Sequence, residues 1–336
     1  MSDPRDARRI SIAAAVVTYG QRSELAAETC RRAIAAGCSS VFLIVNGEAA
    51  WSGGLEHLEG DASVTVQYLP ANSGSQGGFR AAIDLAVRTD PEFHYLVLLD
   101  DDNYLDESVD LREVIGDISQ GDSRQCGMIV RDLSVLHRKL LAGTDARLAI
   151  PARGSFAGFD LCQFLRRRLS HRRAHRSPEW TFLPYCGYGG LVLSRDAVGA
   201  LPFSSQPEYV LYEDDTALTF SLTELGYTIE LIARAKIIEA DGKWNSIRGG
   251  LHGVAAPISS GRSFRSYYQI RNRAHFDRHL YRREKVRFAL NRLLVLAVWM
   301  AVAASQHRLS DFLWALSAVR MGERQRLGVD ARYPLP

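Results

Sequence analysis

Short apolar runs alternate with helix-forming stretches in the first hundred residues of the chain. The apolar runs lie at residues 12–18, 41–45, 64–69 and 94–99, and the helix-forming stretches at 22–36 and 76–88. Apolar runs of this length are typical of buried strands, and their alternation with helices is typical of a sheet with mainly parallel strands. The sequence therefore predicts an α/β fold with such a sheet across residues 10–130.

The pattern is less regular in the second half of the chain. Strand-like runs lie at 189–193 and 228–238, with a helix at 214–225 between them. Residues 262–287 then hold nine Lys and Arg against two acidic residues, a net charge of +7, and the apolar run Leu293–Ala304 follows. The sequence therefore predicts a basic helical region at the C-terminal end.

The apolar run Leu293–Ala304 spans 12 residues, fewer than the ~20 that a membrane-crossing helix needs. We expect a buried or interfacial helix here instead. Two interpretations stay open for residues 285–320. One is a helical subdomain packed on the sheet, and the other is an anchor whose apolar burial adds to its attraction for anionic lipid.

The composition is that of a globular protein. Of 336 residues, 46% are hydrophobic and 24% charged, which excludes a disordered chain, a collagen-like chain and a protein with many membrane spans. The formal net charge of +3 argues against a uniform nucleic-acid-binding surface. The five cysteines form no CxxC pair, and residues 1–9 lack the apolar core of a secretory signal, so we expect a reducing, cytoplasmic location.

Three carboxylates, Asp100, Asp101 and Asp102, directly follow the fourth apolar run. Three adjacent carboxylates are hard to keep ionised without a cation, and open α/β sheets bind ligands at the carboxyl ends of their strands. In an extended chain Asp100 and Asp102 point the same way, so they could share Mg²⁺ or Mn²⁺, which prefer oxygen ligands. A plain acidic turn is the alternative.

Two further segments lie at the starts of predicted helices. Residues 72–80 are glycine-rich, which indicates either an anion-binding helix start or a plain turn. Asp214 and Asp215 either cap the helix at 214–225 or, near a bound metal, supply a general base. The chain contains no HExxH, GxSxG or GxGxxG motif, which disfavours metalloprotease, serine-hydrolase and dehydrogenase chemistry.

In their order and spacing these segments resemble the inverting glycosyltransferases of family 2, which have the GT-A fold. The resemblance covers roughly residues 11–245, with further similarity to about residue 276. The segments that carry it are Ala15–Tyr19, Ile44–Gly47, Asn72 with Gly77-Gly78-Phe79, the D-x-D motif Asp100–Asp102, the acidic pair Asp214-Asp215, and Tyr267–Arg273, which is similar to a Y-Y-x-x-R-N segment of bacterial galactofuranosyl- and rhamnosyltransferases.

The chain departs from the family pattern at three positions. Val45 stands where an Asp often precedes Asn46, and Ala82 replaces a common glycine. Some relatives carry a metal-binding His about 24 residues after the base, and this chain has Glu239 there. A carboxylate is an acceptable ligand of Mg²⁺ or Mn²⁺, so Glu239 is either a third metal ligand or a surface residue.

The resemblance assigns a role to each candidate residue. It implies metal binding by Asp100, Asp102 and Glu239, and proton abstraction by Asp215 as the general base. The residues that it assigns to the nucleotide or donor are Thr18, Tyr19, Asn46, Asn72, Gly77, Gly78, Arg80 and Asp101. The candidates for acceptor contacts are Asp214, Tyr212 and Trp244. The two aromatic residues among them would stack on a sugar ring, unless they belong to the core.

The resemblance also implies a domain organisation. Residues 1–9 are expected to be a polar tail and residues 246–336 the basic helical C-terminal region. Residues 10–245 are expected to be the GT-A catalytic domain, with a nucleotide-binding half at 10–130 and an acceptor half at 131–245.

The implied reaction is the transfer of a sugar, with inversion, from a nucleotide diphosphate to a hydroxyl of a glycan or lipid-linked glycan. It would use Mg²⁺ or Mn²⁺ and take place at the inner face of the cytoplasmic membrane. The GGF and Y-Y-x-x-R-N segments favour UDP-galactofuranose as the donor, with dTDP-rhamnose and other UDP-hexoses as alternatives. We expect no nucleic-acid partner and leave a homo-oligomer open.

Two rival functions deserve comparison with the transferase. A sugar nucleotidyltransferase is disfavoured because Val17-Thr18-Tyr19-Gly20 stands where its glycine-rich, basic stretch is expected. A non-catalytic glycan- or membrane-binding relative is the alternative from another class. Such a relative has no need to keep the metal and base carboxylates, all of which are present here.

Overall fold

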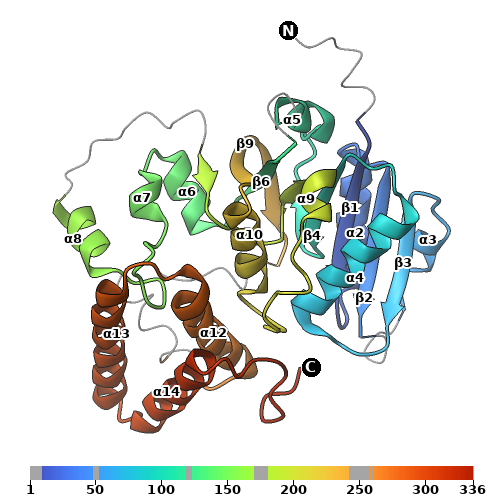
Figure 1. Cartoon of the computed structure of the whole chain (residues 1–336). Helices are drawn as coiled ribbons and strands as arrows, with labels where there is room; N and C mark the ends of the chain where they lie inside the picture. Colours follow the sequence, from blue (N-terminus) through green and yellow to red (C-terminus); the bar gives the residue numbers. More distant parts are fainter. Residues whose placement is uncertain are drawn as a thin grey trace. The chain divides into compact units, whose positions relative to one another are not determined.

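The computed structural model describes residues 10–47, 53–118, 123–169, 181–241, 258 and 261–335 (Figure 1). The predicted polar tail at 1–9, the candidate Trp244 and part of the predicted C-terminal region lie outside the described residues. The chain divides into two compact units. The sheet unit comprises residues 1–138, 179–206 and 218–242, and the helical unit comprises 139–178, 207–217 and 243–336.

These limits differ from the domains expected at 10–245 and 246–336. Two segments from the middle of the chain, 139–178 and 207–217, belong to the same unit as the C-terminal helices. Their side chains and backbone groups bond to those helices, as the contacts of Asp160 and Tyr209 show below. Each unit is described by itself.

Among the residues that the structure describes, the sheet unit is built on a nine-stranded sheet with the order β3-β2-β1-β4-β8-β6-β9-β5, and β7 pairs with β9. The strands are β1 (Ile12–Thr18), β2 (Ser40–Asn46), β3 (Val64–Leu69), β4 (Tyr95–Asp100), β5 (Asn103–Leu105), β6 (Gln125–Arg131), β7 (Phe182–Leu183), β8 (Leu191–Ser194) and β9 (Thr228–Glu239). The predicted strands at 12–18, 41–45 and 64–69 are therefore confirmed.

Helices alternate with strands in the first half of the chain, as predicted. The helices of the described residues are α2 (Ser23–Ala35), α3 (Glu56–Glu59), α4 (Gly74–Thr89), α5 (Leu111–Ile118), α6 (Val135–Leu141), α7 (Ala146–Ala149), α8 (Leu161–Leu169), α9 (Arg195–Gly199), α10 (Asp214–Glu224), α12 (Phe264–His275), a π-helical turn (Phe276–Tyr281), α13 (Lys285–Ser305) and α14 (Leu309–Glu323).

The prediction of an α/β fold is confirmed, but the prediction of a mainly parallel sheet holds only for part of it. The four strands from β3 to β4 pair in parallel. Beyond β4 the sheet is mixed, because β8 pairs antiparallel with both β4 and β6, and β5 pairs antiparallel with β9. The antiparallel pairs join segments that are far apart in the sequence, and the apolar pattern of each segment does not indicate which strand it pairs with.

The central strand β1 is buried along its whole length, which explains its continuous apolar sequence. Ile12, Ala14 and Val16 belong to one core cluster together with the inner face of α2. Val17 lies on the opposite face, where its side chain approaches Gly78 of α4. Helices α2 and α4 therefore cover opposite faces of this part of the sheet.

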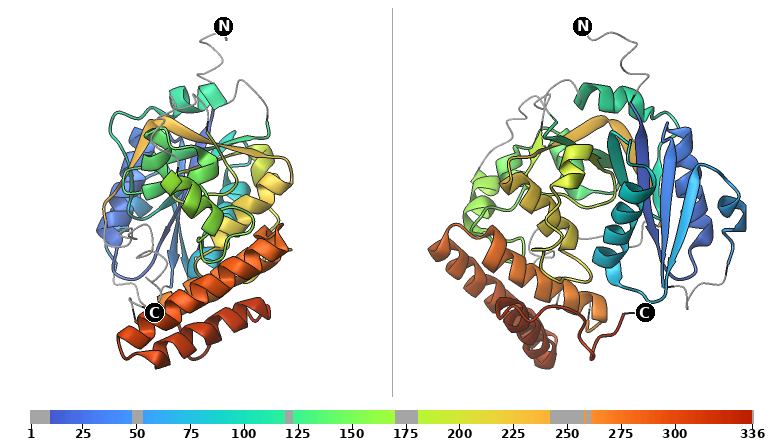
Figure 2. Two further views of the ribbon diagram at one scale, coloured as in Figure 1. Left: turned by 90° about the vertical axis from the view of Figure 1, so that its left-hand side faces the viewer. Right: turned by 45° about the vertical axis from the view of Figure 1, so that its right-hand side comes forward.

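The helical unit is centred on α12, α13 and α14, drawn in orange to red in Figures 1 and 2. Its core contains the large side chains Tyr267, Tyr268, Phe288 and Trp299. The predicted C-terminal helices are therefore present.

The predicted apolar run Leu293–Ala304 is the central part of the longer helix α13. This helix has 21 residues, and its most apolar 18-residue window has a mean hydropathy of 1.8, so by length and composition alone it is able to cross a membrane. The expectation that the run is too short for a span is therefore corrected. Only 28% of the apolar window is buried inside the protein.

Candidate functional site

The acidic triple forms the turn between β4 and β5 in the sheet unit. Asp100 is the last residue of β4 and stands opposite Val17 of the parallel strand β1. Thr18, the last residue of β1, is therefore brought to the same sheet edge as the triple. Carboxyl ends of adjacent parallel strands meet at one edge of a sheet, which is where open α/β sheets bind ligands.

Asp101 is held by contacts within the protein. Its carboxylate accepts a hydrogen bond from the Thr18 hydroxyl at 2.7 Å and two from Arg22, from Nε and Nη2, at 2.8 Å each. Its backbone carbonyl accepts from Thr29 Oγ1 at 2.7 Å. Burial raises the pKa of Asp101, while Arg22 and Thr18 oppose that rise. The residue predicted to bind the donor thus fixes the shape of the acidic turn.

Arg22 also connects two further carboxylates. Its Nη1 donates to Asp241 at 2.9 Å, and its Nη2 lies 3.3 Å from an oxygen of Asp102. Burial raises the pKa of Asp102, and the nearby Arg22 lowers it. Nothing in the sequence pattern had indicated Arg22, because it lies about 80 and 220 residues from its partners.

The buried Asn103 bonds to both Asp100 and Asp102. Asn103 Oδ1 accepts from the backbone N–H of Asp100 at 3.1 Å, and its Nδ2 donates to Asp102 at 3.1 Å. A Cβ atom added to Gly189 would lie 2.9 Å from Asp100 Oδ2 and would overlap Asn103 Oδ1. Residue 189 therefore has to lack a side chain for the acidic turn to keep this conformation.

Glu239 is brought to the acidic turn by strand pairing. It ends β9 and stands opposite Asn103 of β5, and the N–H of the next residue, Ala240, donates to the Asp102 carbonyl at 2.9 Å. Its buried carboxylate accepts from Arg131 Nε at 2.6 Å. Burial raises the pKa of Glu239, and Arg131 lowers it. The alternative of a surface residue is thus wrong for Glu239.

The oxygen atoms at this edge of the sheet are of the kind that binds a hard divalent cation. Asp100, Asp101, Asp102, Glu239 and Asp241 bring five carboxylates, and their guanidinium partners are Arg22 and Arg131. The balance is negative, and carboxylate oxygens suit Mg²⁺ or Mn²⁺. Across the part of the chain that the structure describes, no group of three or more His, Cys, Asp or Glu is already arranged to hold a metal. Glu239 and Asp101 are instead bonded to arginines.

Asn46 holds the glycine-rich turn in place. Its Oδ1 accepts from both the backbone N–H and the hydroxyl of Ser73 at 2.9 Å, and its Nδ2 donates to the Gly74 carbonyl at 2.8 Å. Asn72 Oδ1 accepts from the Gly74 N–H at 2.9 Å. The two predicted donor-binding asparagines therefore shape the loop that opens α4.

The two glycines of the GGF segment are required by close packing. A Cβ on Gly77 would overlap Ser73, and one on Gly78 would lie 2.7 Å from Val17 Cγ1 and 3.1 Å from Asn46 Nδ2. Phe79 follows and packs against Tyr188, with ring centroids 4.2 Å apart. These contacts explain the glycines without a bound ligand.

Two other predicted donor residues lie near the surface of the sheet unit. Tyr19 is partly buried, and the Arg22 guanidinium lies 5.7 Å from its ring centroid. Arg80 is exposed on α4, with its guanidinium 5.6 Å from the ring of Phe203. Both side chains are accessible to a ligand.

The acidic pair Asp214-Asp215 belongs to the helical unit and follows a strained segment. Val210, Tyr212 and Glu213 have φ angles of 71°, 63° and 63°, a left-handed conformation that is rare for residues other than glycine. Such strain persists only where the surroundings hold it, and it is frequent at functional sites. Asp214, at the start of α10, is buried, and Asp215 is partly exposed.

The Y-Y-x-x-R-N segment holds this strained segment. The buried Asn272 donates from Nδ2 to the carbonyls of Tyr209, Leu211 and Tyr212 at 3.0, 2.7 and 3.1 Å. Its Oδ1 accepts from Arg271 Nε at 2.9 Å. The sequence suggested that this segment matters, but only the tertiary structure shows its contact with residues 209–212.

Glu213 lies beside a buried ion pair. Arg273 Nη1 is 3.5 Å from the Glu213 carboxylate, and Arg273 Nε is 2.9 Å from Asp277. Burial raises the pKa of Glu213 to about 7; Arg273 opposes this rise and Asp215 adds to it. The protonation of Glu213, a residue to which the sequence pattern assigned no role, therefore changes near neutral pH.

The two predicted aromatic acceptor contacts have different outcomes. Tyr212 is partly buried and packs against the core of the helical unit. Trp244 lies outside the described residues.

Comparison with known proteins gives a likeness only at the level of solved structures. No family model matches the chain, and no curated protein matches it. It is similar to S. aureus TarS 1-349 in complex with UDP, with a TM-score of 0.45 and 12% identity over 94% of this chain and 88% of that chain. For TarS 1-349 in complex with UDP-GlcNAc the TM-score is 0.46 at 12% identity, over 94% and 83% of the two chains. For GalNAc-T7 with UDP, GalNAc and Mn²⁺ it is 0.47 at 12% identity, over 89% and 58%. These likenesses are distant, and the function proposed below rests on the residues of this chain.

Proposed function

We propose that this chain is an inverting glycosyltransferase of family 2 that uses a nucleotide-diphosphate sugar. The observation that carries the proposal is the acidic edge of the sheet unit. Asp100 and Asp102 stand at the carboxyl end of β4, beside the opening strand β1. More carboxylates than guanidiniums surround them, which favours binding of a divalent cation together with a diphosphate.

The residues of the acidic edge have distinct roles in the proposal. Asp100 and Asp102 would hold Mg²⁺ or Mn²⁺, which when bound supplies Lewis-acid stabilisation of the diphosphate leaving group. Asp101 and Arg22 fix the turn that carries these two carboxylates. Glu239 neutralises Arg131, which would otherwise oppose a cation, and it is the proposed third oxygen ligand.

Asp215 is the proposed general base. It takes the proton of the acceptor hydroxyl while that oxygen bonds to the anomeric carbon of the donor, and the bond from that carbon to the diphosphate oxygen breaks. One in-line displacement of this kind inverts the anomeric centre and releases the nucleoside diphosphate. Asp215 suits this role better than Asp214 because it is the more exposed of the two.

The donor is proposed to be UDP-galactofuranose and the acceptor a glycan or lipid-linked glycan. The GGF and Y-Y-x-x-R-N segments support this donor through their resemblance to galactofuranosyltransferases. The same segments occur in rhamnosyltransferases, so dTDP-rhamnose is the second donor to test.

Nucleotide binding is the first test. The melting temperature is measured with UDP and dTDP, each with Mn²⁺ and with EDTA. A ligand that binds only the folded protein raises its melting temperature, so we expect a rise that needs the metal and identifies the base. A folded protein whose melting temperature no nucleotide changes would overturn the proposal.

Sugar transfer is the second test. Asp215→Asn should lower kcat by roughly 10²- to 10⁴-fold with nucleotide binding unchanged. Asp196→Asn is the matched control, since Asp196 is also the second residue of a helix, α9, and is exposed. Equal effects of the two substitutions would contradict the assignment of the base, and a non-catalytic relative would show no transfer in either variant or in the parent protein.

A further inference from the structure

Helix α13 of the helical unit is apolar around most of its circumference. From Leu293 to Ala304 it contains no polar side chain. A helix that is apolar on all sides is normally buried on all sides, yet only 28% of the apolar window of α13 is buried. The exposed part of its apolar surface therefore needs an explanation.

The exposed residues of α13 form one continuous stripe. Side chains that recur every three or four residues share a helix face, and the exposed members of this face include Val286, Leu290, Leu293, Ala297, Met300 and Ala304. Val286 is 86% exposed, Leu293 65% and Met300 50%. The buried residues Phe288, Val295 and Trp299 lie on the opposite face and pack in the core.

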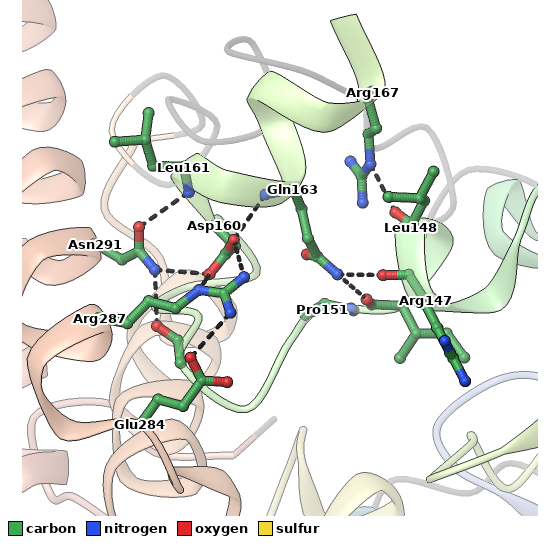
Figure 3. Close-up of polar contacts among 12 residues, drawn as sticks. Arg147, Leu148, Pro151, Asp160, Leu161, Gln163, Arg167, Glu284, Arg287 and Asn291 are labelled. Atoms are coloured by element: carbon green, nitrogen blue, oxygen red, sulfur yellow. Dashed lines mark hydrogen bonds and ion pairs between the residues drawn. The ribbon is translucent and has the colours of Figure 1, made fainter. Parts of the chain in front are cut away.

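The buried face of α13 is fixed to the rest of the helical unit by polar contacts (Figure 3). Arg287 donates to both oxygens of the buried Asp160, at 2.7 and 2.6 Å. Asn291 donates to Asp160 and to the Gly154 carbonyl, and accepts from the Leu161 N–H. A helix that crossed a bilayer would separate Arg287 and Asn291 from these partners at a high cost.

The charge around α13 indicates what covers the stripe. Arg283 and Lys285 are exposed at its N-terminal end. Residues 261–335 contain 15 Lys and Arg against five Asp and Glu, a net charge of +10. An apolar helix face next to exposed basic residues is suited to the boundary between lipid headgroups and acyl chains of an anionic membrane.

We propose that α13 is a docking surface that lies flat on an anionic membrane, with the stripe inserted and Asp160 keeping its contacts to the helix. A second copy of this chain is a weaker candidate for the occupant. A two-fold symmetric contact through the stripe would bring two copies of the same basic segment together, and like charges repel. The inference does not depend on the proposed sugar transfer.

Vesicle flotation of the full chain tests the proposal. Vesicles of phosphatidylcholine alone are compared with vesicles that also contain phosphatidylglycerol. We expect flotation with the anionic vesicles at low salt and weaker flotation at high salt. Leu293→Gln combined with Met300→Gln should reduce the bound fraction at least about tenfold, because both side chains lose burial in the membrane.

Leu169→Gln is the matched control, since Leu169 is a 77% exposed leucine on α8 of the same unit, and it should float like the parent protein. Lys285→Glu should weaken flotation with anionic vesicles only. Retained flotation of the double variant, or equal loss with Leu169→Gln, would overturn the proposal. So would a parent protein that forms oligomers through the stripe without binding vesicles, which sedimentation of the parent and the double variant would reveal. A thermal shift with nucleotide reports separately on the sheet unit.

Discussion

Arg22 and Asp101 form a two-point ion pair, in which Nε and Nη2 of the guanidinium each donate at 2.8 Å to a different oxygen of one buried carboxylate. The pair connects the start of α2 to the turn after β4. The side chain of Asp101 is almost fully buried, so water cannot replace Arg22 as the partner of its negative charge. The conformation of the acidic turn therefore depends on Arg22.

Arg22→Ala is expected to lower the free energy of unfolding by about 3 kcal/mol, since it leaves the Asp101 carboxylate buried without its main partner. Urea denaturation measures the effect. Arg31→Ala removes an exposed ion pair with Glu28 from the same helix and should cost at most about 1 kcal/mol. Equal losses in the two variants would mean that Asp101 does not depend on Arg22.

Gly189→Ala is expected to weaken the metal-dependent binding of nucleotide roughly 10- to 100-fold, because a Cβ would displace Asp100 and Asn103 without changing any charge. Titration of UDP in the presence of Mn²⁺ measures this. Gly199→Ala is the control, since a Cβ there meets nothing within 4 Å. An unchanged affinity in Gly189→Ala would show that metal-dependent nucleotide binding does not depend on the conformation of the acidic turn.

Glu213→Gln is expected to change the pH dependence of stability. The pKa of Glu213 is raised from 4.5 to about 7 by burial, so the folded protein binds a proton more tightly than the unfolded chain does. This group therefore lowers the free energy of unfolding as the pH rises from about 4.5 to 7. Glutamine removes that loss and should stabilise the protein relative to its parent by roughly 1–3 kcal/mol at pH 8.

Denaturation of the parent and Glu213→Gln at pH 5 and pH 8 provides the measurement. The difference between the two should be small at pH 5 and large at pH 8. Glu113→Gln, on the exposed side of α5, controls for the loss of one negative charge. A difference that is the same at both pH values would exclude a raised pKa at Glu213.

Asn272→Asp is expected to destabilise the protein by about 2 kcal/mol or more, because a carboxylate cannot donate to the three carbonyls that Asn272 bonds. This should hold even though Asp would gain an ion pair with Arg271. Thermal and urea denaturation measure stability. A change in kcat would show whether Asp215 keeps the position that the reaction needs. Asn272→Asp with parental stability would show that residues 209–213 keep their strained conformation without this contact.

The local elements could largely be read from the sequence. The predicted strands at 12–18, 41–45 and 64–69 are present, and the acidic triple stands at the end of β4 as expected. Each of these depends on residues close together in the chain, whose apolar pattern and turn residues leave a direct signal. The length of α13 was underestimated, because its first turns contain the polar residues Arg287, Asn291 and Arg292, which contact protein.

The candidate site is a different case. That Asp101 is bound by Arg22, that Arg131 is bound by Glu239, and that Asn272 holds residues 209–212 could not be predicted from spacing. These partners are separated by 60 to more than 100 residues in the sequence. The family resemblance implies that Asp101 and Asn46 bind the donor, and the tertiary structure adds that their side chains bond to Arg22 and Ser73.

The sequence by itself determined the α/β class, the acidic turn and the basic apolar C-terminal region, because composition and local periodicity encode them directly. Only the tertiary structure decided which arginine lies against which carboxylate, which face of α13 is exposed and which segment Asn272 holds. The physical reason is that charge balance and burial belong to residues brought together by long-range strand pairing and helix packing, and such contacts leave no periodic trace along the chain.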